Sequence, residues 1–187
     1  MRYLFLSVVL VVGLMACKQS VKGKNGVTYK SATDYNDYIV NRQTSLIKRV
    51  MEFGKVADAN LDSAQALLTK SVKEVETMIG EIKGMPPFKG DSSLRDAAIA
   101  SFSFYKKVFE KDYTTILNIR KKGEGNITPE DAVEANSIIE NITKEEEGLD
   151  KIFQSAQRDF ASKNSMQLKD NKVQKDLEKE LDKMNKE

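Results

Sequence analysis

Apolar residues recur every three or four positions through most of this chain, which is the spacing of one face of an α-helix. The pattern begins at Tyr35 and is still present at Phe160. Its firmest interruption is the segment Met85-Pro86-Pro87-Phe88-Lys89-Gly90, whose two prolines cannot donate backbone hydrogen bonds. No stretch has the alternation of a half-buried strand. The sequence therefore predicts an all-α fold, an antiparallel up-down helical bundle.

Capping residues and breaks divide this pattern into helices. Asp34, Asp91 and Thr128 are predicted N-caps, and Pro129 with two acids after Thr128 is typical of a helix start. Gly84 is predicted to follow a helix end. We expect four helices, near residues 34–57, 59–83, 91–122 and 128–163. The break near residue 58 is weak, so three long helices, with 34–83 unbroken, are the alternative.

The last predicted helix has the longest regular stripe. Its apolar positions keep a spacing of three or four over more than 28 residues, which is typical of a helical bundle or a coiled coil. We expect this stripe to face the core: Ala132, Ala135, Ile139, Ile142, Leu149, Phe153, Ala156 and Phe160.

Composition excludes several function classes. The 187 residues favour one domain, and the net charge is only +2, which argues against a nucleic-acid partner. There is no His, so the commonest general base and transition-metal ligand is missing. The single Cys allows neither an intrachain disulfide nor a thiolate metal cage. We therefore expect no catalytic residues, no metal site, and no cofactor beyond lipid; the chain is predicted not to be an enzyme.

The amino terminus has the order of a secretory signal. Arg2 precedes a ten-residue apolar run from Tyr3 to Val12, which is too short to span a bilayer. Small residues and then a polar stretch follow. Residues 1–16 are predicted to be a signal peptide that is removed on export.

Leu14-Met15-Ala16-Cys17 resembles the lipobox of bacterial lipoproteins. The resemblance implies that the lipoprotein signal peptidase recognises Leu14, Met15 and Ala16, although Met15 is a tolerated rather than a favoured residue. It also implies that the Cys17 thiol carries diacylglycerol and that the freed amino group can take an acyl chain. The alternative is an ordinary secreted protein that is cleaved after Ala16.

This reading places the protein in the cell envelope, anchored to a membrane by lipid. No Asp follows Cys17 to indicate inner-membrane retention, so the outer membrane is favoured. Residues 17–33 are polar and contain two glycines, which predicts a lipidated flexible tether. The helical bundle domain is expected at 34–163. A charged helical tail is expected at 164–187, with a thin stripe at Val173, Leu177, Leu181 and Met184.

Three polar residues fall on or beside the apolar stripes: Arg49, Asp112 and Glu146. In an up-down bundle, Arg49, Tyr105 and Glu146 lie at similar distances from one end. We predict that Arg49 and Tyr105 satisfy the carboxylate of Glu146 in a buried polar layer that fixes register. Asp112 is expected about 12 Å from Glu146 along the axis, too far for a pair of catalytic carboxylates.

A family resemblance rests on one distinctive loop. Met85-Pro86-Pro87-Phe88-Lys89-Gly90-Asp91 is followed by Leu94-Arg95-Asp96-Ala97-Ala98. Together with Tyr35-Asn36-Asp37-Tyr38-Ile39 and Phe153-Gln154-Ser155-Ala156-Gln157, it resembles a family of bacterial surface lipoproteins of the spirochaete type. The similarity covers about residues 30 to 168. It implies an envelope lipoprotein with a helical domain, no established activity and no catalytic residues to carry over.

Two functions follow as hypotheses. The first is a non-enzymatic lipoprotein that binds or scaffolds a protein partner in the envelope through its bundle face or its tail. The alternative is a carrier that holds a hydrophobic ligand between the helices, lined by Phe104, Tyr105 and Tyr113. Aromatic residues at helical spacing are more often core than ligand pocket.

Overall fold

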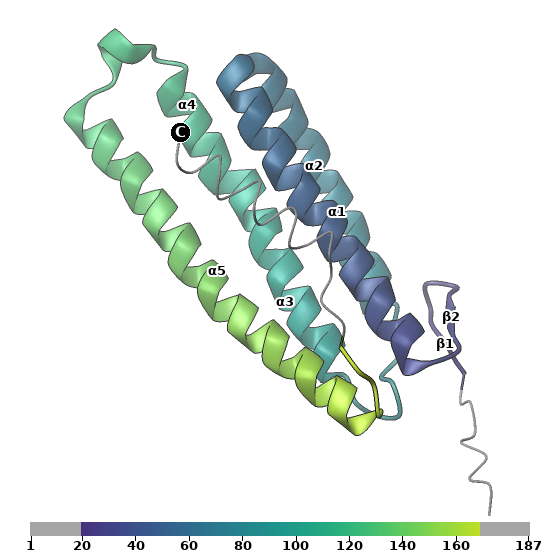
Figure 1. Ribbon diagram of the computed structural model, residues 1–187. Helices are drawn as coiled ribbons and strands as arrows, with labels where there is room; N and C mark the ends of the chain where they lie inside the picture. The colour runs from purple at the N-terminus through teal and green to yellow at the C-terminus, as the bar shows by residue number, and fades with distance from the viewer. Residues whose placement is uncertain (1–19, 169–187) are drawn as a thin grey trace, which may run out of the picture.

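A computed structural model describes residues 20–168 as an all-α helical bundle (Figure 1). The predicted signal peptide, Cys17 and the part of the predicted tail after Leu168 lie outside these residues. The helices are α1 (Ala32–Ala59), α2 (Leu61–Lys83), α3 (Ser93–Lys107), α4 (Tyr113–Arg120) and α5 (Pro129–Lys163). A π-helical turn, η1 (Val108–Asp112), joins α3 and α4 into one rod, and a 3-10 turn, η2 (Glu124–Asn126), precedes α5. The predicted fold class is confirmed.

The break between α1 and α2 favours four helices over three. Asn60 has an extended backbone, ends α1 and caps α2, since its side chain accepts a hydrogen bond from the amide of Ser63 at 2.7 Å. Thr128 is confirmed as the N-cap of α5: its hydroxyl accepts from the Asp131 amide, and the Asp131 carboxylate accepts from the Thr128 amide. This reciprocal pair satisfies two donors that the first turn leaves free.

Two other predicted caps are displaced. Ser31, not Asp34, is the N-cap of α1, because the Ser31 hydroxyl accepts from the Asp34 amide at 3.0 Å. The N-cap position of α3 is Ser92 rather than Asp91, although the Asp91 carboxylate still accepts from the Ser93 amide at 2.9 Å. At α1 the side chain of Ser31 takes the capping role three residues earlier, whereas at α3 the side chain of Ser92 makes no cap hydrogen bond and that of Asp91 supplies the acceptor.

The prediction of a flexible tether over residues 17–33 is wrong for its described part. Strands β1 (Val21–Lys22) and β2 (Thr28–Tyr29) pair antiparallel, with Val21 opposite Tyr29. The turn between them rests on the end of α2: the amide of Lys24 donates to the Gly84 carbonyl at 2.7 Å, and the Asn25 side chain donates to the Glu81 carbonyl at 2.9 Å. The hairpin is thus fastened to the bundle.

Gly84 has a role other than the predicted one. Its φ is −72°, so no left-handed residue ends α2 there. A Cβ at this position would lie 2.8 Å from the Asn25 backbone nitrogen, so the residue has to be small for the hairpin to approach.

An aromatic cluster fills the end of the bundle beneath the hairpin. The Tyr35 ring contacts Tyr29, Phe88 and Phe160, with centroids 5.2, 5.3 and 5.4 Å away. All four side chains are at most 3% exposed. The Tyr35 hydroxyl donates to the Pro86 carbonyl at 2.9 Å, so the double-proline loop joins the core through both ring and backbone. We call this end the base: the hairpin 21–29, the loop 84–92 and the helix ends around them.

At the other end, the α1–α2 turn and the loop between α4 and α5 lie together (Figure 1). Ion pairs of Arg120 with Asp58 and of Lys121 with Asp62 join them. We call this the distal end. Helix α5 packs mainly on α3 and little on α4. Among the described residues, no helix is both long and apolar enough to cross a membrane.

Candidate functional site

The structure brings together two of the three residues predicted to form a polar layer. The Tyr105 hydroxyl, on α3, donates to the Glu146 carboxylate, on α5, and both side chains are half-buried. Burial, and after it the negative charge of Glu146, raises the pKa of Tyr105. Burial also raises the pKa of the neighbouring Tyr113 to about 12. The two helices therefore share a polar contact at mid-height.

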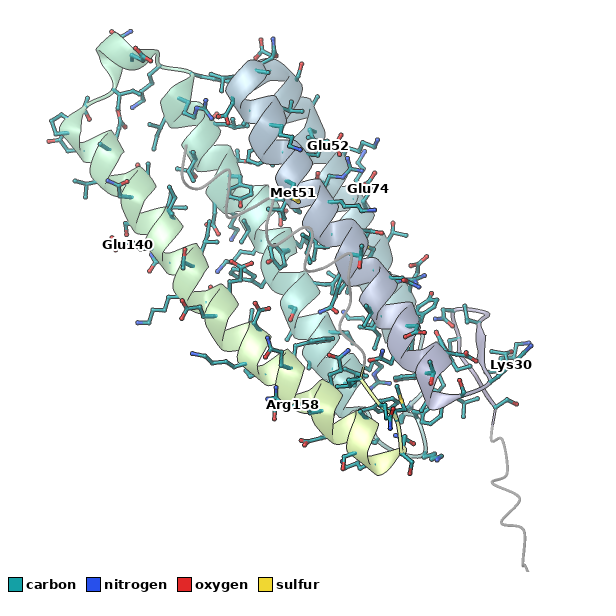
Figure 2. The ribbon with its side chains drawn as sticks, in the orientation of Figure 1. Lys30, Met51, Glu52, Glu74, Glu140 and Arg158 are labelled. Carbon is teal, nitrogen blue, oxygen red and sulfur yellow. The ribbon has the colours of Figure 1, made fainter. Side chains whose placement is uncertain are left out.

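Arg49 does not join this contact, so the three-residue layer is wrong. Its guanidinium pairs with Glu74 across the α1–α2 interface, at 2.8 Å from Nε, and also with Glu52 one turn further along α1. Figure 2 shows Glu52 and Glu74 on this side of the bundle, away from α5. Equal height along a bundle does not place two residues on adjacent helices: at the height of Arg49, the α3–α4 rod lies between α1 and α5 (Figure 1).

A groove between the α3–α4 rod and α5 begins next to this contact. It has a volume of about 520 Å³ and is lined by charged and apolar side chains: Lys107, Asp112, Ile138, Asn141, Ile142 and Lys144. Lys107 pairs with Glu145 across it at 2.6 Å. Burial raises the pKa of Asp112, and the positive charge of Lys107 opposes that rise. The groove therefore presents both charged and apolar side chains to a molecule that binds there.

The π-helical turn positions one side of this groove. A π turn inserts an extra residue into a helix, and such turns are frequent at functional sites. Here it allows Tyr113 to stack on Phe53 at 4.6 Å while Phe109 stays fully buried. The sequence predicted one helix over residues 91–122 and did not predict this turn.

The residues suggested as lining for a hydrophobic ligand are part of the packing. Phe104 is 5% exposed, Tyr113 stacks on Phe53, and Tyr105 is bonded to Glu146. None of the three lines the groove beside α5. The ligand-lining prediction is therefore unsupported at these positions.

The amino-terminal half of α5, residues 129–150, is the least covered helix segment; we call it the arm. Val133 is 69% exposed and Ile139 is 52% exposed. The prediction that Ala132 and Ile139 belong to a buried stripe is wrong, because the arm has little contact with α4. Sequence reasoning missed this surface, since the apolar spacing of the arm equals that of a buried helix.

The arm is also strongly acidic. Residues 129–150 hold eight Asp and Glu and one Lys, a net charge of −7. Figure 2 shows Glu140 on its outer side, pointing away from the bundle. Asp131 pairs with Lys122, Glu145 pairs with Lys107, and Glu146 accepts the hydroxyl of Tyr105. The arm therefore presents exposed apolar side chains within a negative field.

Within residues 20–168, no group of three acidic or cysteine side chains converges as a metal site would. The predicted lipobox residues Leu14, Met15, Ala16 and Cys17 lie outside the described residues. Compared with known proteins, the chain matches no family model, no curated protein and no solved structure.

Proposed function

We propose that this chain is a lipid-anchored lipoprotein of the cell envelope, in the outer membrane rather than the inner, that works without catalysis as a binding module. Its proposed partner is a protein segment that is both basic and amphipathic, bound along the arm. The observation that carries the proposal is the arm itself, which combines exposed Val133 and Ile139 with a net charge of −7.

The arm suits a helical partner segment. Such a segment binds by laying an apolar stripe along an apolar surface, while basic side chains at its edges meet the acids. The adjacent groove offers Ile138 and Ile142 as apolar contacts and Asp112 as a half-buried acid. Exposed apolar side chains within a charged rim are typical of protein-binding surfaces.

The anchor and the absence of catalysis rest on the sequence. Leu14-Met15-Ala16-Cys17 resembles a lipobox, and two or three acyl chains hold a protein stably on a membrane. The lack of any His removes the commonest catalytic side chain. Substitution Cys17→Ser tests the anchor: we expect the protein to leave the membrane fraction and to lose the lipid mass at its amino terminus. A Cys17→Ser protein that stays membrane-bound overturns the anchor.

Binding through the arm is tested with a photo-crosslinking residue in intact cells. Placed at 133 or 139, it should give one discrete crosslinked protein, and, with the crosslinking residue at 133, the substitution Ile139→Lys should abolish that product. The matched control position is Arg158, which is exposed on the carboxyl half of the same helix (Figure 2). Equal crosslinking from residues 139 and 158, or none from the arm, overturns this part of the proposal.

A further inference from the structure

The base carries five exposed lysines that form no ion pair with any residue between 20 and 168. They come from the hairpin, from the residue after it, from the end of α2 and from the loop before α3: Lys22, Lys24, Lys30, Lys83 and Lys89. The contacts of the hairpin with Gly84 bring these segments to the same end of the bundle. In Figure 2, Lys30 extends outward from this end.

The acids of the base do not neutralise these lysines. Glu81 pairs with Arg42, Asp91 with Lys163, and Asp96 with Arg95. Three acids of the base, Asp34, Asp37 and Asp159, form no ion pair within the described residues, against five such lysines; Asp34 accepts only the backbone amide of Lys30. Positive charge therefore dominates the base.

The cations of the distal end are held in pairs instead. Arg120, Lys121 and Lys122 each meet an acid, namely Asp58, Asp62 and Asp131. The arm adds its net charge of −7 toward the same end. The molecule is thus electrically polarised along its long axis, although the chain without residues 1–16 has a net charge of only +1, because Arg2 is the one charged residue in that segment.

The base is also the end closest to the proposed lipid. Only Lys18, Gln19 and Ser20 separate Cys17 from β1, and four residue steps span at most about 14 Å. The hairpin is hydrogen-bonded to the end of α2, so a lipid on Cys17 would hold the base itself near the membrane. Since 14 Å is only the upper limit, the lysines can approach an anionic surface to within the Debye length of about 8 Å at physiological salt, where the attraction is not screened out.

We propose that the five unpaired lysines of the base form a docking surface for anionic phospholipid headgroups, which holds the bundle upright with its arm turned away from the membrane. The inference deepens the proposed function, because it assumes that the lipid is attached beside the base. Negative headgroups attract the base and repel the acidic arm. Since α5 is 35 residues long, the start of the arm would stand on the order of 50 Å from the surface.

The lipid surface can be tested without the anchor. The chain from residue 17 with Cys17→Ser is mixed with vesicles of phosphatidylcholine alone or with three-tenths phosphatidylglycerol, and bound protein is measured by sedimentation. We expect binding only to the anionic vesicles and loss of binding at high salt. A basic side chain near an anionic surface contributes about fivefold in affinity, so Lys22→Gln, Lys24→Gln and Lys30→Gln together should weaken binding on the order of 100-fold.

A matched control separates position from charge. Lys48, Lys111 and Lys151 are exposed on the flanks of the bundle, and their replacement by Gln removes the same charge. This variant should bind nearly as well as the parent, and circular dichroism should show equal helicity in both. Equal weakening by the two sets, or equal binding to neutral vesicles, overturns the inference. Its failure is distinct from that of the anchor, which is judged by the lipid mass on Cys17 in cells.

Discussion

The two halves of α5 share one apolar pattern and differ in what covers it. In the carboxyl half, Phe153 and Phe160 are at most 6% exposed. In the amino half, Ile139 is 52% exposed, although it belongs to the same stripe. The base surrounds the carboxyl half with α1, α3, the loop 84–92 and the hairpin, whereas the arm has little contact with α4. Apolar spacing therefore identifies the apolar face of a helix, but whether that face is buried depends on which elements pack against it.

This difference suggests that the two halves of α5 have different roles. The carboxyl half of α5 secures the fold at the base, where Gln157 also donates to the Asn36 side chain of α1 at 2.8 Å. The amino half is the part that we propose binds a partner. A helix whose stability rests on one end can expose apolar residues at the other without loss of the fold.

The largest expected effect is a difference in stability between substitutions in the two halves of α5. Phe160→Ala removes a ring that contacts Tyr35 and Phe88, and we expect it to lower the free energy of unfolding by about 3–5 kcal/mol. Ile139→Ala, on the same helix, should change it by less than about 1 kcal/mol, because the side chain is half in water. Urea denaturation followed by circular dichroism measures both. Similar losses for the two variants would mean that the arm is packed as tightly as the base.

The helical part of the fold could be predicted from the sequence because its signals are local. Thr128 with Asp131, the two prolines and the stripe spacing each act within a few residues, and the structure confirms the helices they indicate. The break at Asn60 was weaker, since Asn caps a helix without stopping the apolar pattern.

The hairpin and the pairing of Arg49 could not be predicted, because both depend on distant residues. The Asn25 side chain bonds to Glu81, 56 positions away, in a segment whose composition reads as a flexible linker. Arg49 finds Glu74, 25 positions away, because α1 lies against α2. Of the candidate site, the Tyr105–Glu146 contact was predictable from axial height. The open arm was not, since exposure depends on the tertiary arrangement.

The second prediction concerns alkaline pH and the tyrosines of the base. Burial raises the pKa of Tyr29 to about 12, and it also raises the pKa of Tyr35 and of Tyr38. In the unfolded chain a phenol ionises near pH 10, so the folded form retains protons that the unfolded form has lost. The contribution of these buried phenols to the free energy of unfolding should be fully present below pH 10 and be lost as the pH rises from 10 to 12.

Phenolate absorbance and helical circular dichroism, followed together against pH, measure this effect. We expect a delayed titration of the buried phenols that coincides with the loss of helix. If all phenols ionise near pH 10 while the helical signal is unchanged, the base is open to water and the comparison with the arm fails.

The third prediction tests the contact between hairpin and bundle. In Gly84→Ala, the new methyl group would lie 2.8 Å from the Asn25 backbone, so the hairpin must shift, at a cost of about 1–3 kcal/mol. The control is Gly148→Ala in the arm, where nothing lies within 4 Å of the new Cβ. Alanine is a better helix former there by about 0.5–1 kcal/mol, so this variant should melt higher. Thermal unfolding of the two variants should therefore move in opposite directions.

The fourth prediction concerns the contact at which the two halves of α5 meet. Tyr105→Phe removes the hydroxyl that donates to Glu146 and keeps the ring, so we expect a loss of about 1 kcal/mol, as is usual for one hydrogen bond. Tyr113→Phe is the matched control on the same rod, since the contacts of Tyr113 described above are those of its ring. Chemical denaturation compares them. If Tyr105→Phe and Tyr113→Phe change the free energy of unfolding by the same amount, the hydrogen bond from the Tyr105 hydroxyl to Glu146 contributes nothing to stability.

The smallest effect is expected at the ion pairs of the distal end. Asp58 pairs with Arg120 at 3.2 Å, but its side chain is 76% exposed, so water and salt screen the attraction. Asp58 also lies in the last turn of α1, where the helix dipole disfavours a negative charge, and this offsets part of what the pair contributes. We expect Asp58→Ala to change the free energy of unfolding by less than about 0.5 kcal/mol, with no dependence on salt. A larger, salt-sensitive loss in denaturation would mean that charge pairing, rather than the aromatic packing of the base, holds the bundle together.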